Sequence, residues 1–560
     1  MFHGLYCGYT AGLGATGSAL GLPQDKKKDM AGKALIKLFC VPCKPTKTNG
    51  GRTRNYPNHE PEKWQLFKNY CIQDVVTETE IYKRLSFFPV PQAEQDLWVL
   101  DIKINSFGVK VDTELVAGAL AVNDETVREL TEEAKKITGL ENPNSTVQLL
   151  KWLNDKTKLN IANLQKSTVA DLINTISDEN LKRVLVIRQE LAKTSIKKYV
   201  AMQEAIGPDD RVRGLLQFYG ANRTGRWAGR LVQVQNLPRN YIETLDTARE
   251  IVKNQNTEGL KMLYGNVSDT LSQLIRTAFI PSENHKFVVA DFSAIEARVI
   301  AWLSGEKWRQ EVFATHGKIY EASASQMFGV PIEKIVKGNP EYTLRAKGKV
   351  AELALGYGGS TGALIAMGAE DMGLTEDELK DIVRRWRSAN KQIVNLWYAL
   401  EDAVVSLMET GSPQTVKGII FRREGELVHG QHFMTVELPS GRKLYYPRPF
   451  MEDNRFGVPS LHYWGINQTT GKWEVQETYG GKLTENIVQA ISRDCLAVTL
   501  QRIREKGLQT VMHIHDEAVI DAPLNISVDE MCKMMGQPIR WAEGLILRAA
   551  GFESNYYMKD

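Results

Sequence analysis

The sequence predicts a mixed α+β protein, and three stretches carry that prediction. Residues 93–220 repeat apolar positions at helical spacing in long amphipathic runs. Residues 410–480 alternate and turn, which is typical of β-hairpins. Residues 510–521 contain two short apolar strands on either side of an acidic turn at 515–517.

Composition sets wide limits on function. The chain has 560 residues, enough for several domains or one multi-lobed enzyme, and its formal charge of +3 neither demands nor excludes nucleic acid. No apolar run approaches ~20 residues and the first residues lack a basic segment before an apolar core, so we expect neither a membrane span nor a signal peptide. Six cysteines do not make a disulfide framework, which fits a reducing cytosol, and the lone pair Cys40 and Cys43 lacks the partners of a zinc site.

The first 95 residues look like an incomplete unit. The beginning is rich in glycine, the charge run Asp25–Asp29 predicts a solvated loop, and residues 44–55 predict an exposed one. Residues 64–85 predict a helix. Its expected apolar face consists of Leu66, Tyr70, Val75, Ile81 and Leu85.

The next 125 or so residues predict a helical region. One helix begins at 93–102, and the amphipathic pattern continues over 113–137. The break at 142–146 offers Ser145 or Thr146 as the cap of the following helix. Residues 181–205 predict another helix, whose neighbouring lysines at 193, 197 and 198 are either a solvated face or an edge that follows phosphates.

Residues 221–238 are rich in Gly, Arg, Gln and Asn and predict an irregular segment with too few apolar residues for a core element. Arginine and amide side chains suit a nucleic-acid backbone and the minor groove. A polar surface loop explains the same composition.

Two predicted strands each end in an aspartate. Residues 287–290 are a buried strand with Asp291 at its end, and Ser293 is placed to cap the helix that follows. The hairpin at 510–521 holds Asp516 and Glu517 at its tip, where carboxylates are rigid enough for a divalent metal. A plain turn is the alternative for each aspartate.

A helix predicted within 342–359 carries an unusual face. Arg345, Lys349, Leu353 and Tyr357 are four residues apart, so neighbours share a side. A face that runs from basic to apolar to aromatic suits neither solvent nor core, but it suits a triphosphate at one end and a base at the other. A further helix, 482–506, leads into the acidic hairpin.

These blocks, in this order, resemble motifs A, B and C of family A DNA polymerases, the group of bacterial DNA polymerase I. The matching blocks are Asp291–Arg298, Arg345–Gly358 and His515–Glu517, and Thr224–Arg226 with Gln235–Pro238 resembles the segment before motif A. The resemblance implies a right-hand polymerase of thumb, palm and fingers, whose sequence is most similar to polymerases of phages and prophages. It implies a partial RNase H-like exonuclease unit at 1–95, thumb at 96–220, palm at 221–304 and 426–560, and fingers at 305–425.

The resemblance also implies roles for single residues. Asp291 and Asp516 hold two Mg²⁺ ions, for which Mn²⁺ can substitute, with Glu517 nearby. Arg345 and Lys349 clamp the phosphates, and Lys349 protonates the leaving group. The remaining implied contacts are with the nucleotide, through Leu353, Tyr357, Tyr320 and the steric gate Glu296, and with primer-template DNA, through Arg226, Gln235, Asn236, Gln489 and His515.

The chain departs from the family pattern in several places. Leu353 stands where many relatives have Phe or Tyr, Tyr320 where bacterial relatives have histidine, and Lys482 is only the nearest match to an expected basic residue. Tyr70 and Asp74 match the third exonuclease motif, but residues 1–60 lack the other acidic motifs. Because that chemistry needs about four carboxylates around two metals, we expect a remnant without proofreading.

The leading hypothesis is therefore a DNA polymerase that uses dNTPs, works as a monomer and acts in bacterial or phage-infected cytoplasm. A single-subunit RNA polymerase is an alternative that Glu296 disfavours. A non-catalytic DNA-binding remnant is a second alternative, disfavoured because the expected carboxylates are present. A nuclease would rest on Tyr70 and Asp74 alone.

Overall fold

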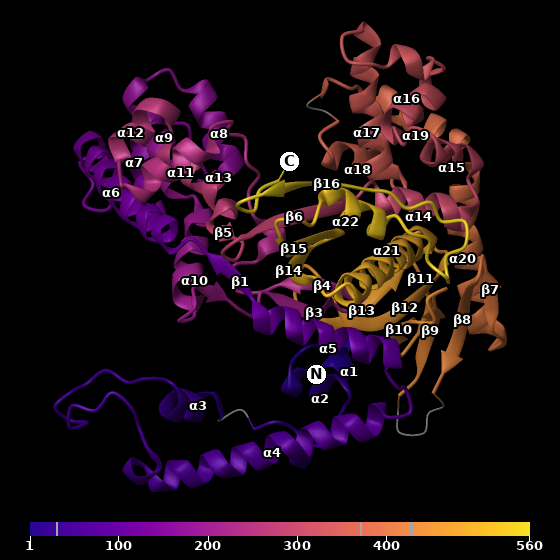
Figure 1. The fold of residues 1–560 in the computed structure, drawn as a ribbon, viewed down its shortest axis with the longest axis horizontal. Coiled ribbons are helices and arrows are strands. Elements are labelled where there is room, and N and C mark those ends of the chain that lie inside the picture. Colours follow the sequence, from indigo (N-terminus) through magenta and orange to yellow (C-terminus); the bar gives the residue numbers. More distant parts are fainter. Residues whose placement is uncertain (30–31, 370–371, 426–430, 560) are drawn as a thin grey trace.

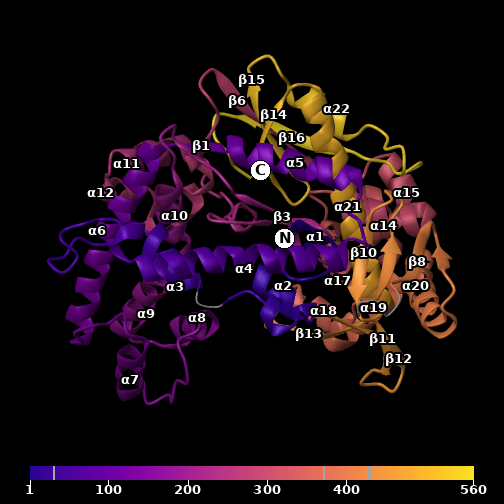
Figure 2. The same ribbon diagram turned by 90° about the horizontal axis from the view of Figure 1, so that it is seen from below.

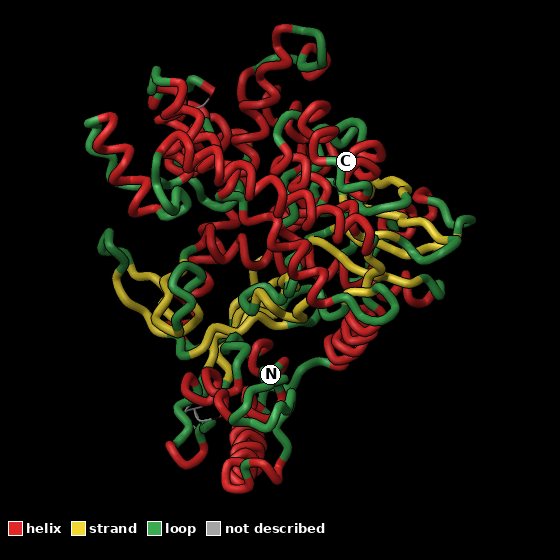
Figure 3. Tube along the Cα trace, turned by 90° about the vertical axis from the view of Figure 1, so that its left-hand side faces the viewer, coloured by secondary structure: helices red, strands yellow, loops and turns green. Residues whose placement is uncertain are grey.

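The protein is described from a computed structural model that covers residues 1–29, 32–369, 372–425 and 431–559. The predicted palm start at 426 and chain end at 560 lie outside these ranges. Two helical lobes flank a central group of strands (Figure 1). Seen from the side, the strands form a band across the molecule between helical regions (Figure 3). The predicted mixture of helices and sheets is confirmed.

A four-stranded antiparallel sheet forms the centre, in the order β14-β15-β6-β16. Its strands are β6 (His285–Phe292), β14 (Gln509–Ile514), β15 (Glu517–Pro523) and β16 (Ala549–Ser554). Helix α22 (Val528–Met535) packs against β6 and β16, and α5 (Gln92–Phe107) and α21 (Gly480–Glu505) pack against β14. The middle of β15 is buried at every position, which explains its continuous apolar run.

The region predicted to be largely helical after residue 93 also contains a short strand. Helix α5 ends at Phe107, and β1 (Val109–Val111) precedes α6 (Thr113–Thr138). Gly108 lies between them with φ +71°, and a Cβ there would approach the Val212 carbonyl oxygen to 2.5 Å. The short sheet β2-β1-β5 is completed by β2 (Arg211–Val212) and β5 (Phe279–Ile280).

The first helical lobe has a small core of its own, separate from the main one. Ser145 caps its helix as predicted, because its side chain accepts from the backbone N–H of Gln148. The helix predicted over 181–205 is instead two helices with a break at 192–196. With α6, the lobe contains α7 (Thr146–Thr157), α8 (Lys166–Thr175), α9 (Glu179–Leu191), α10 (Lys197–Ala205), α11 (Leu245–Lys253), α12 (Thr257–Tyr264) and α13 (Val267–Leu274).

The segment expected to be irregular after residue 221 forms part of a hairpin. Strand β3 (Leu216–Ala221) pairs with β4 (Arg226–Gly229), and Trp227 is buried. The prediction that this segment has too few apolar residues for a core element was wrong, because the apolar residues present are spaced so that they pack into the core. The buried ones beyond Trp227 are Val232, Val234 and Leu237.

The second helical lobe begins after β6. Ser293 does not cap α14, because Ala294 takes the N-cap place in a left-handed conformation with no side-chain hydrogen bond. The helices are α14 (Ile295–Ser304), α15 (Lys307–Ala314), α16 (Ile319–Phe328), α17 (Leu344–Leu355), α18 (Thr361–Ala366), α19 (Glu376–Ala389) and α20 (Lys391–Thr410).

Two further antiparallel sheets confirm the predicted hairpins at 410–480. One has the order β10-β9-β8-β7 and the other β11-β12-β13. Their strands are β7 (Gln414–Val416), β8 (Ile419–Glu424), β9 (Phe433–Glu437), β10 (Lys443–Pro447), β11 (Phe450–Asp453), β12 (Pro459–Ile466) and β13 (Trp473–Thr478).

The first 95 residues divide into a buried part, which begins with α1 (Phe2–Tyr6) and α2 (Leu13–Ala19), and an exposed arm, which consists of α3 (Gly32–Cys40) and α4 (Pro61–Leu85). Helix α1 lies in the main core, where Tyr6 is buried, followed by α2. Helix α3 packs on the long helix α4, which crosses the underside of the molecule (Figure 2). The predicted helix is confirmed, but its apolar face is not continuous, because Leu66 and Val75 are exposed.

No helix in the described ranges is long and apolar enough to cross a membrane. All six cysteines are free, as expected, and Cys40 is exposed.

Candidate active site

The turn between β14 and β15 brings the two predicted aspartates together. Glu517 pairs directly with Asp291 across β15 and β6, so Asp516, one residue earlier, lies at the same end of the sheet. His515 has φ +57°, a left-handed conformation that closes the tight turn. The sequence predicted both strands, and their pairing places both aspartates in one site.

The carboxylates of this cluster repel one another. Burial and then the negative charge of Asp291 raise the pKa of Asp516 to about 7. Burial also raises the pKa of Glu517, against the attraction of Lys559. One buried oxygen of Asp291, Oδ1, has no hydrogen-bond partner. The cluster therefore favours any cation that can reach it.

Lys559 is such a cation, and the sequence analysis missed it. Its Nζ lies 3.3 Å from Asp291 Oδ2 and 3.0 Å from Glu517 Oε2. Burial disfavours the charged amine, but the attraction of Glu517 and Asp291 outweighs it and raises the pKa of Lys559. Tyr557 also donates to Glu517, at 2.7 Å. No sequence pattern marks a lysine after β16 as a neighbour of the aspartates.

The donor set fits Mg²⁺ that is shared with a substrate. Within the described ranges, no group of three His, Cys, Asp or Glu side chains forms a ready metal cage. Mg²⁺ commonly uses one or two carboxylates and fills its other positions with water and substrate phosphates. The unpartnered oxygen of Asp291 and the nearby Asp516 meet that requirement, whereas Glu517 is engaged by Tyr557 and Lys559.

Glu296 joins two other predicted site residues. Its carboxylate accepts from Tyr357 Oη at 2.7 Å and from the Arg226 guanidinium. Burial and then the charge of Glu296 raise the pKa of Tyr357 well above its usual value, so the phenol keeps its proton. A cavity of about 310 Å³ is lined by residues that include Glu296, Tyr320, Leu353, Tyr357 and Asp516.

Helix α17 carries only three of the four residues predicted on it. It ends at Leu355, so Tyr357 lies just beyond it. A Cβ on Gly481, at the start of α21, would come within 2.3 Å of the Tyr357 carbonyl oxygen, and glycine there permits this close approach. Leu353 is half-exposed beside the same cavity.

Arg345 and Lys349 line a different hollow, of about 790 Å³. The guanidinium of Arg345 donates to Glu321 at 2.8 Å and lies 5.5 Å from the Tyr320 ring centroid. The described structure thus brings the two basic residues to one surface, but not into the cavity beside Asp516.

The predicted DNA contacts lie on four parts of the chain: β4, the short helical turn 234–236, the turn between β14 and β15, and α21. His515 lies near Gln235, and burial followed by the charge of Arg226 lowers the pKa of His515. Asn236 is exposed beside Gln235. On α21, Gln489 donates to Glu485 at 3.2 Å. Lys482, the nearest match for the missing basic residue, pairs with Glu485 too, at 2.9 Å.

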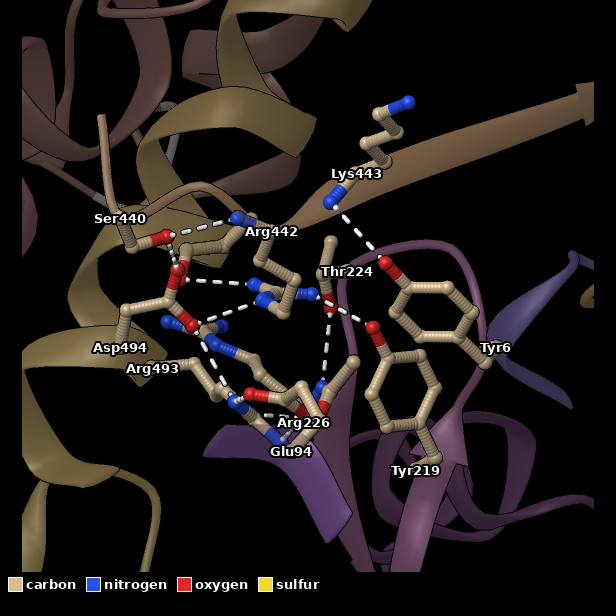
Figure 4. Close-up of polar contacts among 12 residues, drawn as sticks. Tyr6, Glu94, Tyr219, Thr224, Arg226, Ser440, Arg442, Lys443, Arg493 and Asp494 are labelled. Atoms are coloured by element: carbon tan, nitrogen blue, oxygen red, sulfur yellow. Dashed lines mark hydrogen bonds and ion pairs between the residues drawn. The ribbon is translucent and has the colours of Figure 1, made fainter. Parts of the chain in front are cut away.

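A buried ion network, which the sequence analysis missed, supports Arg226. Arg493 donates to the two oxygens of Glu94 at 2.6 and 2.7 Å and to the carbonyl of Gly225 at 3.0 Å. Gly225 directly precedes Arg226, so the network fixes the backbone that carries this arginine. Figure 4 shows the other buried members, Tyr219, Arg442 and Asp494.

The predicted exonuclease pair lies on α4, far along the chain from the cluster. Lys28 donates to Tyr70 Oη at 2.6 Å and to Asp74 Oδ2 at 2.8 Å. The prediction that the whole 25–29 run is a solvated loop is therefore wrong for Lys28, whose ammonium is part-buried between these two residues.

Comparisons with known proteins agree with this geometry. The sequence profile of DNA polymerase family A matches residues 116–423. The chain is 56% identical over 547 residues to the DNA polymerase of Bacillus phage SP02, covering 97% of this chain and 83% of that protein. It is 26% identical over 261 residues to the thermostable DNA polymerase I of Thermus aquaticus, covering 46% of this chain and 25% of that protein.

A solved structure shows the same fold. The POL domain of Pol1 from M. smegmatis, in complex with DNA primer-template and dNTP, superposes with a TM-score of 0.56 at 17% identity, covering 87% of this chain and 74% of that chain. The family match spans more than half of the chain, and the phage relative is matched over most of its length. This chain belongs to DNA polymerase family A.

Proposed function

We propose that this chain is a template-directed DNA polymerase that adds dNTPs to a primer 3′-hydroxyl by two-metal-ion nucleotidyl transfer, in phage or prophage replication. The observation that carries the proposal is the β15–β6 pairing, which places Asp516 beside Asp291. The phage DNA polymerase at 56% identity supports the activity, and the structural neighbour bound to primer-template and dNTP supports the substrates.

Asp291 and Asp516 are the proposed metal ligands. Family A polymerases use divalent metals. When bound, two Mg²⁺ ions lower the pKa of the primer hydroxyl and neutralise charge on the departing pyrophosphate, and Mn²⁺ can substitute. Glu517 assists from beside these ligands, where hydrogen bonds from Tyr557 and Lys559 hold its carboxylate.

Residues on and beside α17 handle the nucleotide. Arg345 and exposed Lys349 clamp the phosphates, and Lys349 gives a proton to the leaving group. Tyr320 lies beside Arg345, at the phosphate end. Tyr357 and Leu353 meet the base.

Glu296 excludes the ribose 2′-hydroxyl. The bonds from Tyr357 and Arg226 fix its side chain at the edge of the cavity, which supports a steric role. The same arrangement argues against an RNA polymerase.

The DNA contacts proposed are Arg226, Gln489 and His515 at the primer end, with Gln235 and Asn236 beside them. His515 lies near both Arg226 and Gln235, which supports placing these proposed DNA contacts on one surface. We assign residues 96–220 to the thumb, 221–304 and 426–560 to the palm, and 305–425 to the fingers. Within the range 221–304, helices α11–α13 pack with α6, so we place these helices with the thumb and keep the rest of the range in the palm. A monomer in bacterial or phage-infected cytoplasm is the proposed working state.

We also propose that this chain does not proofread. Asp74 is neutralised by Lys28, and Tyr70 shares that lysine, which leaves little attraction for a metal. Release of mononucleotides from 3′-labelled DNA, abolished by Asp74→Ala, would overturn this part of the proposal.

Primer extension tests the function. Wild type and Asp516→Ala are compared on a primed template with four dNTPs and Mg²⁺, and in parallel with four rNTPs. We expect template-dependent extension with dNTPs that the variant loses. Extension with rNTPs alone would favour an RNA polymerase, and no extension despite intact primer-template binding would favour a non-catalytic remnant.

A further inference from the structure

The segment after β16 is anchored beside the carboxylate cluster. Tyr557 is fully buried, its N–H donates to the Phe279 carbonyl at 2.9 Å, and its hydroxyl accepts from Arg276 at 2.8 Å. Two residues later, the backbone N–H of Lys559 donates to Asn240 at 3.1 Å. Lys559 is thus tethered at the site by its own backbone and by that of Tyr557.

The ammonium of Lys559 bridges two different strands of the site. It contacts Asp291 on β6 and Glu517 on β15, at 3.3 and 3.0 Å. The contacted Glu517 is 2% exposed, so its charge is otherwise removed from water. A unit charge in this place stabilises carboxylates that would repel one another without it.

A divalent ion cannot share this place freely with an ammonium. Asp291 is both a partner of Lys559 and a proposed ligand of the metal. Two cations within a few ångströms repel strongly in a partly buried site. The lysine stem is flexible, with its charge at the far end of four carbons, so the ammonium can withdraw while Tyr557 stays anchored.

We propose that Lys559 is a tethered cation that holds the catalytic carboxylates together in the metal-free protein and competes with the divalent metal for them. This inference rests on the proposed metal-binding role of Asp291 and Asp516. As a consequence, a metal ion that enters the site displaces the ammonium of Lys559. One cation is exchanged for another, so the negative charge of the three carboxylates is balanced in part at every stage.

Mn²⁺ binding without nucleotide tests the competition. Calorimetric titrations compare wild type with Lys559→Met, Lys559→Arg and a control, Lys286→Met, which removes a lysine paired with Glu553 on the same sheet. We expect Lys559→Met to bind Mn²⁺ about tenfold more tightly, while Lys559→Arg and the control stay near wild type. Unchanged or weaker binding in Lys559→Met, or an equal gain in Lys559→Arg, would overturn the proposal.

Thermal melting supplies a readout that needs no metal. In EDTA, Lys559→Met is expected to melt about 1 to 2 °C below wild type, and saturating Mn²⁺ is expected to abolish that difference. An unchanged melting temperature in EDTA contradicts the proposed role of Lys559 in the metal-free protein. If wild type and Asp516→Asn bind Mn²⁺ equally, the metal assignment itself fails, a result distinct from failure at Lys559 alone.

Discussion

Two of the lysine–aspartate pairs in this chain, Lys559 with Asp291 and Lys28 with Asp74, differ in what surrounds the pair. At the proposed palm, Lys559 contacts Asp291 and Glu517, with Asp516 at the same end of the sheet. On the arm, Lys28 contacts Asp74 and the hydroxyl of Tyr70. In both places one aspartate oxygen is buried without a partner.

The difference is the charge that remains after the lysine is counted. Three carboxylates with one lysine leave the palm negative. Burial, and then the nearby charge of Asp291, raise the pKa of Asp516 to about 7. One carboxylate with one lysine leaves the arm neutral. A divalent ion is therefore drawn to the carboxylates that strand pairing brings together, and not to the arm, where one lysine pairs with one aspartate.

The largest expected effect separates the two places directly. Asp291→Asn removes a carboxylate of the palm, and we expect primer extension to fall about a thousandfold or more, because the metal loses a charged ligand. Asp74→Asn removes the matching group of the arm and is expected to leave extension unchanged. Steady-state rates on one primed template compare the two variants. Comparable losses in both would break the comparison.

Acid is expected to destabilise the protein through His513 on the central sheet. Burial and then the charge of Arg493 lower the pKa of His513, on β14, from 6.5 to about 3. The unfolded chain therefore takes up this proton first as pH falls below 6.5, so stability present at pH 7 is lost on acidification, about 2 kcal/mol of it by pH 5. Urea unfolding at pH 7 and pH 5 measures the loss, which should shrink in His513→Gln. An equal loss in that variant contradicts the assignment.

A smaller effect tests whether Glu296 is a steric gate or a metal ligand. Glu296 is a carboxylate at the palm, but Tyr357 and Arg226 engage it. Glu296→Ala should raise the efficiency of rNTP relative to dNTP incorporation about tenfold while dNTP extension continues. Competition assays with single nucleotides report the ratio. Loss of all extension would instead place Glu296 among the ligands.

The smallest effect is expected at the arm. Partial burial lowers the pKa of Lys28, but the bonds to Asp74 and Tyr70 together with the charge of Asp74 outweigh it and raise that pKa. The pair therefore adds stability below pH 10.5 that is lost as pH rises through the folded-state pKa. Because the pair is partly solvated, Lys28→Met should cost under about 1 kcal/mol at pH 7 and less at pH 11.5. Denaturant unfolding at both pH values checks this. A larger cost at pH 7 would mean that the arm depends on its ion pair more than the geometry indicates.

Sequence reasoning succeeded where a local pattern sets the geometry. The short apolar runs around Asp291 and Asp516 were predicted as strands and are strands, and the tight turn at His515 follows from the short interruption in the second run. Helix α21 and the capping of α7 by Ser145 were predictable for the same reason, since neighbours in the chain decide them.

It failed where distant segments meet. Lys559 reaches Asp291 from 268 residues away, and Arg493 reaches Glu94 from 399 residues away. Contacts between residues so far apart leave no periodic pattern in the sequence. The hairpin strand β4 was missed because its burial depends on β3 and the core, not on its own polar composition. Ser293 lost its cap role because Ala294 begins the helix in a left-handed turn.

The most direct test of the central claim is Mn²⁺ binding to wild type, Asp516→Asn and Asp74→Asn, measured by calorimetry without DNA or nucleotide. The claim is that converging carboxylates, and not an isolated one, make the metal site. We expect wild type to bind Mn²⁺, Asp74→Asn to retain that binding in full and Asp516→Asn to lose it. Retention by Asp516→Asn together with loss in Asp74→Asn would contradict it.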